Sequence, residues 1–407
     1  MKDKKILFGT FIALLLLLTT GLSYAYFSAS ISGNENAKNV VVEAGTLSLV
    51  YTDGPEIKAQ NIKPGWSTTK EVSVKNNGTL DAYYNVIWQS LTNEITNNEM
   101  VISATCQKLN ASGTVEGTCE SIPQAPISDM TIAKRVSIES GITHKYTFTI
   151  LFKETYADQN TNQGKKFNGV LGIEEYVLTQ FEKDDWATIV SNVKSGNISD
   201  YNVGDVKDVD LGTYGTHTLR LANTSTPSEC STEGFSQTAC GFVLEFEDII
   251  TTKAMNSTLT NSGGWPAMSM RTFVNNDIYN SLPSELKNAI IDTRVVSGHG
   301  SNDSTNFTST DKIYLLASKE IYIDYNSSSD SAKDLTRTLD YYKNLGVTTT
   351  NRTGAIKKNG TTASTWWLRA AYSYSTGTFT MVDASGFWPG HGNANLSNGV
   401  APAFRLG

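Results

Sequence analysis

The chain has 407 residues, a formal net charge of −7 at pH 7, and a composition that is 39% hydrophobic and 18% charged. This length predicts about two to three domains, and the apolar content excludes a disordered or fibrous chain. The acidic balance, with no basic stripe along the sequence, argues against a nucleic-acid partner.

The N-terminus has the pattern of an export leader. A basic segment at residues 1–5 precedes a nearly unbroken apolar run at residues 6–27. A small-x-small motif predicts signal-peptide cleavage between Ala25 and Tyr26. The alternative is an uncleaved membrane anchor formed by residues 6–27, because about 20 apolar residues can span a bilayer. Both interpretations predict an exported chain at the cell surface or outside the cell, with the leader as its contact to the membrane.

Four cysteines occur as two local pairs. Cys106 and Cys119 enclose one turn-rich loop, and Cys230 and Cys240 enclose another. An even number of cysteines in an exported chain predicts the disulfides Cys106–Cys119 and Cys230–Cys240, with four free thiols as the alternative. The sequence has no CxxC pair and no HExxH or HxH pattern, so we expect no metal and no cofactor.

Residues 44–180 are predicted to form an antiparallel β-sandwich. Residues 28–43 are polar and are predicted to be a lead-in segment. After them, apolar and polar residues alternate with a period of two, and turn residues separate the alternating segments. The predicted strands are residues 46–51, 70–75, 82–88, 135–139, 146–152 and 170–176. Several short strands of this kind indicate two packed antiparallel sheets.

Several motifs in this part resemble the TasA/camelysin family of exported Gram-positive proteins. They are an apolar leader ending in AYFS, then EAGTLSL, IKPGWSTTKEVSVKNNGTLDAYY, YTFTILFKET and QNTNQGKKFNGVLGIEE, and the match covers roughly residues 1–178. The resemblance implies a SipW-type leader, a jelly-roll sandwich and, for some members, assembly into matrix fibres by donated strands. Camelysin relatives are described as metallopeptidases. No zinc ligand set is recognisable in this sequence, so we do not carry that activity over.

Residues 182–407 are predicted to form an α+β domain. Apolar residues at helical spacing, with capping and stop signals beside them, predict helices that begin near Trp186, Ser269, Pro283 and Ser331. The last of these is predicted to end at Leu345. Strands between the helices are predicted at residues 218–221, 241–246, 312–316 and 379–382. We expect the helices to pack on a shared sheet around one core.

This second part resembles a bacterial domain of unknown function that commonly ends surface proteins. The motifs are WPAMSMRTFVNNDIYNSLP, DKIYLLASKEIY, TWWLRAA and a terminal GVAPAFRLG, within residues 184–407. The ending is similar to C-type-lectin-like folds, including relatives of the formylglycine-generating enzyme, so the resemblance implies a C-type-lectin-like α+β domain. The oxidase chemistry of those relatives needs cysteines near the C-terminus, and no cysteine follows Cys240.

A glycine-rich segment at residues 386–395 is the candidate ligand site. It is predicted to be a loop before the final strand, where lectin-like folds place ligand contacts. An aromatic ring in such a loop can stack on a sugar, and a few polar groups fix the orientation of the ligand. The predicted ligand-binding residues are Trp388, His391, Asn393 and Asn395, with Tyr372 and Tyr374 from a neighbouring loop. The alternative is a solvated turn, because glycine and asparagine also suit positive φ angles.

Other conspicuous residues are predicted to be structural. Trp366 and Trp367 are expected to pack in the core, and the guanidinium groups of Arg369 and Arg405 are expected to bind carbonyls or carboxylates. Three aspartates lack the spacing of a calcium loop and are expected to be solvated charges: Asp303, Asp311 and Asp324.

These features predict a non-enzymatic cell-surface or extracellular-matrix protein. Its C-terminal domain is predicted to present a loop face to a glycan or a surface protein. Self-assembly is a further prediction, with residues 28–43 donating a strand to a neighbouring copy. A purely structural fibre subunit and an exported hydrolase are the alternatives, and no GxSxG motif supports the hydrolase.

Overall fold

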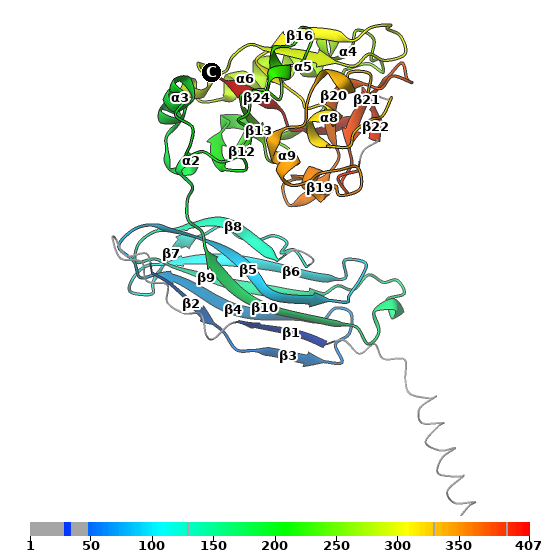
Figure 1. The fold of residues 1–407 in the computed structure, drawn as a ribbon. Coiled ribbons are helices and arrows are strands. Elements are labelled where there is room, and N and C mark those ends of the chain that lie inside the picture. Colours follow the sequence, from blue (N-terminus) through cyan, green and yellow to red (C-terminus); the bar gives the residue numbers. More distant parts are fainter. Residues whose placement is uncertain (1–27, 34–47, 128–129, 329, 388–389) are drawn as a thin grey trace, which may run out of the picture. The chain divides into compact units, whose positions relative to one another are not determined.

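The computed structural model describes residues 28–33, 48–127, 130–328, 330–387 and 390–407 (Figure 1). The chain divides into two compact units, Met1–Val177 and Leu178–Gly407. Three predicted features lie outside the described residues: the apolar leader, its cleavage site at Ala25 and Tyr26, and Trp388. None of the helices in the described part of the chain combines the length and the apolar character that crossing a bilayer requires.

The N-terminal unit consists of two five-stranded sheets. Its strands are β1 (Ser28–Gly33), β2 (Leu49–Asp53), β3 (Ile57–Gln60), β4 (Ser67–Asn76), β5 (Ala82–Asn93), β6 (Met100–Leu109), β7 (Val115–Thr118), β8 (Thr131–Ile138), β9 (Thr143–Phe152) and β10 (Lys166–Glu175). One sheet has the order β3-β1-β10-β5-β8, and the other has the order β2-β4-β9-β6-β7. Among these described strands β1 and β10 pair in parallel, whereas the other neighbours pair antiparallel.

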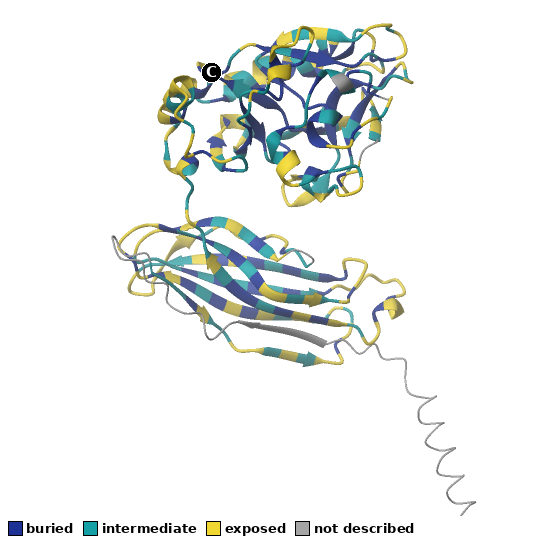
Figure 2. Cartoon of the chain, viewed as in Figure 1, coloured by how far each residue is buried: buried dark blue, intermediate teal, exposed yellow. Residues whose placement is uncertain are grey.

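Side chains from both sheets form one core. Along β9 every second residue is buried, and the same alternation runs along the first half of β5 (Figure 2). Trp88 of β5 meets Phe167 of β10 edge-on, with 5.9 Å between the ring centroids. Phe148 and Ile150 of the opposite sheet belong to the same buried cluster. The predicted antiparallel β-sandwich is therefore confirmed.

The predicted lead-in segment contains a strand. Within residues 28–43, Ser28–Gly33 forms β1 and lies between β10 and β3 in the sheet. Its register runs parallel to β10, from Ser28 opposite Lys166 to Gly33 opposite Leu171, and antiparallel to β3. Pairing on both edges gives the backbone of this short polar segment its hydrogen-bond partners, which the sequence SASISG does not reveal.

The C-terminal unit is α+β, as predicted. Its helices are α2 (Gln180–Lys183), α3 (Trp186–Ser195), α4 (Gly264–Ala267), α5 (Ser269–Phe273), α6 (Tyr279–Ser281), α7 (Ser284–Lys287), α8 (Ser318–Ile321) and α9 (Asp340–Asn344). Its strands are β11 (Val206–Asp210), β12 (Thr216–Asn223), β13 (Phe242–Phe246), β14 (Thr251–Ala254), β15 (Thr293–Ser297), β16 (Phe307–Asp311), β17 (Ile313–Tyr314), β18 (Lys357–Asn359), β19 (Thr362–Ser364), β20 (Trp366–Ala371), β21 (Thr378–Val382), β22 (Gly390–Asn393), β23 (Ser397–Val400) and β24 (Ala403–Leu406). Two five-stranded sheets, β11-β12-β13-β24-β17 and β14-β23-β20-β21-β22, contribute to one hydrophobic core.

Two predicted helices of this unit are confirmed in position. Asp185 caps α3 by accepting a hydrogen bond from a first-turn N–H at 2.7 Å, and Gly196 ends the helix in the left-handed conformation with a φ of 76°. The helix predicted to begin near Ser269 comprises α5, the π-helical segment η4 (Val274–Ile278) and α6.

The predicted helix over residues 331–345 is wrong. The 3-10 turn η5 (Lys333–Leu335) and the short helix α9 take its place. Between them Thr336 is extended, with a φ of −149°, and its hydroxyl donates a 2.8 Å hydrogen bond to the buried Glu320. This tertiary contact overrides the helical spacing of the apolar residues. The helix predicted from Pro283 is reduced to the single turn α7.

Arg369 and Glu320 form a fully buried ion pair. Two guanidinium–carboxylate contacts of 2.6 Å join β20 to α8, and neither side chain is exposed. Arg369 also donates to the carbonyls of Val296 and Leu315 at 3.0 and 2.9 Å, and Glu320 accepts the Ala317 N–H at 2.8 Å. A buried pair is tolerated when its remaining polar atoms are bonded in this way. The prediction that Arg369 binds carbonyls or a carboxylate is confirmed.

The other residues predicted to be structural are also placed as expected. Trp366 and Trp367 are fully buried, and their indole N–H groups donate to backbone carbonyls at 3.2 and 2.9 Å. Arg405 donates to the carbonyl of Cys240 at 2.6 Å. The two tryptophans therefore belong to the core of the unit.

We expect Arg369→Met to lower the free energy of unfolding of the C-terminal unit by about 3–5 kcal/mol, because it leaves Glu320 buried without its cation. The double variant Glu320→Gln/Arg369→Met removes both charges and should recover part of this loss. Urea unfolding followed by tryptophan fluorescence measures both effects. If Arg369→Met were as stable as the wild type, the pair would not hold β20 against α8.

Candidate functional site

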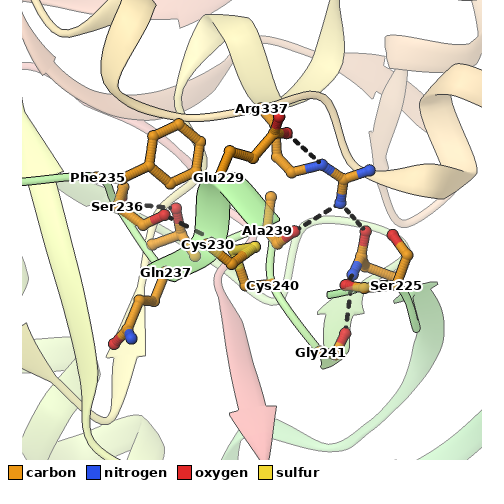
Figure 3. The surroundings of a disulfide bond; sticks show 12 residues. Ser225, Glu229, Cys230, Phe235, Ser236, Gln237, Ala239, Cys240, Gly241 and Arg337 are labelled. Atoms are coloured by element: carbon orange, nitrogen blue, oxygen red, sulfur yellow. Dashed lines mark hydrogen bonds and ion pairs between the residues drawn. A yellow bond between two sulfur atoms is a disulfide. The ribbon is translucent and has the colours of Figure 1, made fainter. Parts of the chain in front are cut away.

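Both predicted disulfides are present. Cys106 and Cys119 are joined with a Cα–Cα distance of 5.0 Å, and Cys230 and Cys240 with a distance of 5.9 Å (Figure 3). The alternative of four free thiols is therefore wrong. Two disulfides are typical of an exported protein.

His144 lies beside the first disulfide. Its ring and the sulfurs of Cys106 and Cys119 place their ligand atoms within 4.8 Å of one another, the one such group of potential metal ligands within the described residues. The two sulfurs are bonded to each other, however, and His144 Nδ1 pairs with the Tyr84 hydroxyl at 2.8 Å. Burial lowers the pKa of His144 to about 4, and Lys108 adds to this effect, so the ring is neutral at pH 7. With the disulfide formed, the group offers no thiolate to a metal.

The three aspartates with no calcium-loop spacing are held by protein groups. Asp311 is buried rather than solvated, because its carboxylate accepts the Arg271 guanidinium at 2.6 Å and the Trp265 indole at 2.8 Å. Asp324 accepts the Thr349 hydroxyl at 2.8 Å. Asp303 accepts a backbone N–H at 3.0 Å. The expectation of a solvated charge is wrong for Asp311.

Three of the predicted ligand-binding residues come together as a cluster of rings. The rings of Tyr372 and His391 are stacked, with 4.2 Å between their centroids and 7° between their planes. Tyr374 meets Tyr372 edge-on, with 5.7 Å between the ring centroids, and the residue is 67% exposed. Asn393 lies two residues after His391 on the same strand, so the two side chains share its exposed face. We call these four residues the aromatic loop face.

Three neighbouring strands position this face. In Figure 1, β20, β21 and β22 lie side by side, and the register places His391 opposite Thr380. Tyr372 directly follows β20, and its N–H donates to the Thr378 carbonyl at 3.0 Å. The turn between β20 and β21 therefore carries Tyr372 onto the ring of His391. The Tyr374 hydroxyl is in turn bonded to the Ser328 hydroxyl at 2.6 Å.

The glycine-rich segment is not the single loop that the sequence predicts. Gly390–Asn393 forms β22, and two further strands follow it. A Cβ at Gly392 would lie 2.8 Å from the Trp367 ring, and a Cβ at Gly390 would lie 2.8 Å from Met381. These glycines permit close packing on the core, whereas Gly386, with a φ of 75°, occupies a turn as predicted. Gly390 and Gly392 are therefore explained by close packing against the core rather than by the conformational freedom of a loop.

The remaining predicted residues of this site lie apart from the ring cluster or outside the description. Asn395 is exposed in the turn that links β22 to β23. Trp388 lies outside the described residues, so its predicted sugar stacking stays a prediction.

Sequence reasoning missed two exposed leucines beside this face. Leu259 and Leu396 are each 55% exposed. The side chain of Leu259 lies next to Gly377. On the other side, Ala394, two residues before Leu396, donates its N–H to the Gly377 carbonyl at 2.9 Å. Isolated leucines in polar loops are the one sequence signal that marks them. Two singly exposed leucines are ordinary on a protein surface and do not by themselves define an interaction site.

The structure thus consists of a β-sandwich unit and an α+β unit that carries an exposed ring cluster. Residues 242–407 match the family model of a domain of unknown function, DUF6273. Residues 3–90 match the family model described as camelysin metallo-endopeptidase. The two resemblances are therefore confirmed for these segments.

Among curated proteins, none matches the chain. A solved structure titled "AvmM Catalyzes Macrocyclization in Alchivemycin A Biosynthesis" is 11% identical, covering 34% of this chain and 95% of that chain, with a TM-score of 0.16. Similarity at this level carries no argument about fold or function.

The metal that the camelysin description implies does not fit the residues present. Residues 3–90 contain neither histidine nor cysteine. In the described part of the N-terminal unit the closest approach to a ligand set is His144 beside the Cys106–Cys119 bond, which has no thiolate. Zinc sites in proteins are built mainly from such side chains. No catalytic step through a metal follows from this structure.

We expect Gly392→Ala to destabilise the C-terminal unit by about 1–3 kcal/mol, because the added methyl group would meet the Trp367 ring. The matched control is Gly117→Ala, where nothing lies within 4 Å of the added atom. Its effect should stay within about 0.5 kcal/mol. Chemical unfolding of both variants makes the comparison, and equal stability of the two would show that β22 is not packed against Trp367.

Proposed function

We propose that this is an exported, non-enzymatic surface or matrix protein whose C-terminal unit binds an extracellular glycan or surface protein through the aromatic loop face. The stacked pair of Tyr372 and His391, with the exposed Tyr374 beside it, carries this proposal. Rigid rings with polar edges suit a site that is wet on one side and apolar on the other. The proposal includes a jelly-roll connection for the N-terminal sandwich and a C-type-lectin-like fold for the C-terminal unit.

The buried charges of the C-terminal unit support a non-enzymatic role. Glu245 accepts the Arg220 guanidinium at 2.8 Å, the Lys357 ammonium at 3.1 Å and the Tyr342 hydroxyl at 2.8 Å. Burial by itself raises the pKa of Glu245, but Lys357 and Arg220 hold it below its usual value. A carboxylate fixed by three partners serves the fold rather than a substrate.

Asp330 is the carboxyl that most resembles a catalytic acid of a hydrolase. Burial raises its pKa to about 6. Its side chain has no exposed surface, and it accepts the Ala332 N–H at 3.0 Å. A general acid must reach the group that it protonates. The complete burial of Asp330 therefore supports a structural role for this carboxyl group and argues against the hydrolase alternative.

The position of β1 favours a second function, that of a fibre subunit. This strand follows the leader directly in sequence and occupies the place between β3 and β10 in its own sheet. The same pairing made with the β1 of a neighbouring copy would join chains head to tail by strand addition. Self-assembly of this kind is compatible with ligand binding by the other unit.

We expect the full-length exported chain to bind a subset of sugars on an array of cell-wall and host glycans. Tyr374→Ala and His391→Ala should each weaken that binding by about tenfold or more, because exposed aromatic anchors dominate such contacts. Tyr156→Ala is the matched control, since Tyr156 is 96% exposed on the other unit. Lack of binding by the wild type would argue against glycan recognition. Unchanged binding by both variants would show that the glycan site lies outside the aromatic loop face.

Deletion of residues 28–33 tests the fibre function. We expect the deleted chain to lose concentration-dependent assembly in sedimentation velocity, because the edges of β3 and β10 would lack the donated strand. A variant in which the sequence of residues 28–33 is scrambled, with its composition kept, is the control for nonspecific effects of the change. Assembly of the deleted chain at wild-type concentrations would refute strand donation.

A further inference from the structure

The C-terminal unit contains a pocket that is separate from the aromatic loop face. Its volume is about 420 Å³, within the range of small-ligand sites. It is lined by residues of the Cys230–Cys240 region, of α8 and the turn after it, of the segment that leads into α9, and of α9 itself: Glu229, Phe235, Lys319, Ile323, Thr336, Arg337, Thr338 and Lys343. Three of these are cations and one is a carboxylate, so positive charge is in excess.

Arg337 forms a fixed wall of this pocket. Its guanidinium donates to the Ala239 carbonyl at 2.8 Å (Figure 3). It also donates to the Asn223 side chain at 2.8 Å and pairs with Asp340 at 2.9 Å. Its Nε pairs with Glu229 at 3.2 Å, which neutralises the one carboxylate of the lining. The charge of Arg337 is thus balanced by the protein itself.

Two lysines supply the charge that the protein leaves unbalanced. The Lys319 ammonium donates to the Ile323 carbonyl at 2.9 Å, which uses one of its three N–H groups. Lys343 Nζ makes no hydrogen bond or ion pair with the described residues, and its side chain is exposed. Both lysines line the same cavity, and each has ammonium N–H groups without a partner among the described residues, which suits them to bind an anion.

The remaining residues of the lining suit the binding of a monosaccharide ring. Phe235 and Ile323 provide an aromatic and an aliphatic surface. The Thr338 hydroxyl donates to the Lys319 carbonyl at 3.0 Å, so its oxygen remains able to accept a hydrogen bond, whereas the Thr336 hydroxyl is already bonded to Glu320 and Thr238. An apolar wall facing placed polar groups is the usual composition of a ligand pocket.

The Cys230–Cys240 bond holds one side of the pocket in place. Glu229 immediately precedes the first cysteine, and Phe235 lies between the two (Figure 3). The carbonyl of Phe235 also accepts the Arg294 side chain at 2.7 Å. The pocket wall is therefore built before a ligand arrives, which lowers the entropic cost of binding.

We propose that this pocket binds a sugar that carries one anionic group, a carboxylate or a phosphate, with Lys319 and Lys343 as the anion-binding residues and Phe235 against the ring. This proposal does not rest on the aromatic loop face. It assigns the C-terminal unit a second binding site, specific for charge.

Isothermal titration of the full-length protein tests the site with three probes: D-glucuronate, D-glucose 6-phosphate and neutral D-glucose. We expect one or both anionic sugars to bind with a dissociation constant of about 10 mM or lower, and this affinity should fall as the salt concentration rises. Neutral glucose should not bind. Preference for glucuronate or for the phosphate tells the two anions apart. Binding of neither anionic sugar, or equal binding of glucose, would overturn the proposal.

Variants place the binding in this pocket. Lys343→Gln and Lys319→Gln should each weaken anionic-sugar binding by about tenfold, because each removes a charged hydrogen-bond donor. The matched control is Lys194→Gln, an exposed lysine of α3, and Tyr374→Ala separates this site from the aromatic loop face. Both controls should bind like the wild type. Equal affinity of Lys343→Gln and Lys194→Gln, with unchanged thermal unfolding, would refute the assignment.

Discussion

The buried pair of Arg369 and Glu320 is the interaction on which the C-terminal unit depends. Arg369 lies on β20, whose continuation carries Tyr372 to the surface. Glu320 lies on α8 beside Lys319, and it fixes Thr336 in the extended conformation that lines the anionic-sugar pocket. One desolvated ion pair thus sets the geometry of two surfaces at once, and its directional bonds define that geometry more narrowly than apolar packing does.

The two units obtain their specificity in different ways. The N-terminal sandwich relies on strand alternation, because a shift of one residue along β9 would turn its buried face to solvent. The C-terminal unit has many short elements and instead buries charged groups among them. Arg220, for example, pairs with Glu245 at 2.8 Å and also lies over the Tyr341 ring at 3.8 Å from its centroid. Short elements gain their fixed positions from such contacts.

The features that the sequence reveals are those with local causes. Alternation located β4, β5, β9 and β10, and the Asp185 cap and Gly196 stop located α3. The inner strand β6 is not among the predicted strands, although its buried and more exposed residues alternate, because the small Ala104 and Cys106 give a weak apolar signal. The role of Gly392 depends on Trp367, which lies on another strand. The pairing of Tyr372 with His391 was expected only as a shared face, since stacking is decided by the register of β20, β21 and β22.

Each disulfide closes a loop within a single unit. The Cys106–Cys119 bond spans 13 residues of the N-terminal unit, and the Cys230–Cys240 bond spans 10 residues of the C-terminal unit. The peptide backbone is consequently the one covalent connection between residue 119 and residue 230. A protease that cuts a single bond in the segment joining the units would sever them chemically while leaving both crosslinks intact. The C-terminal unit would then be released from the N-terminal sandwich as an intact, disulfide-closed fragment.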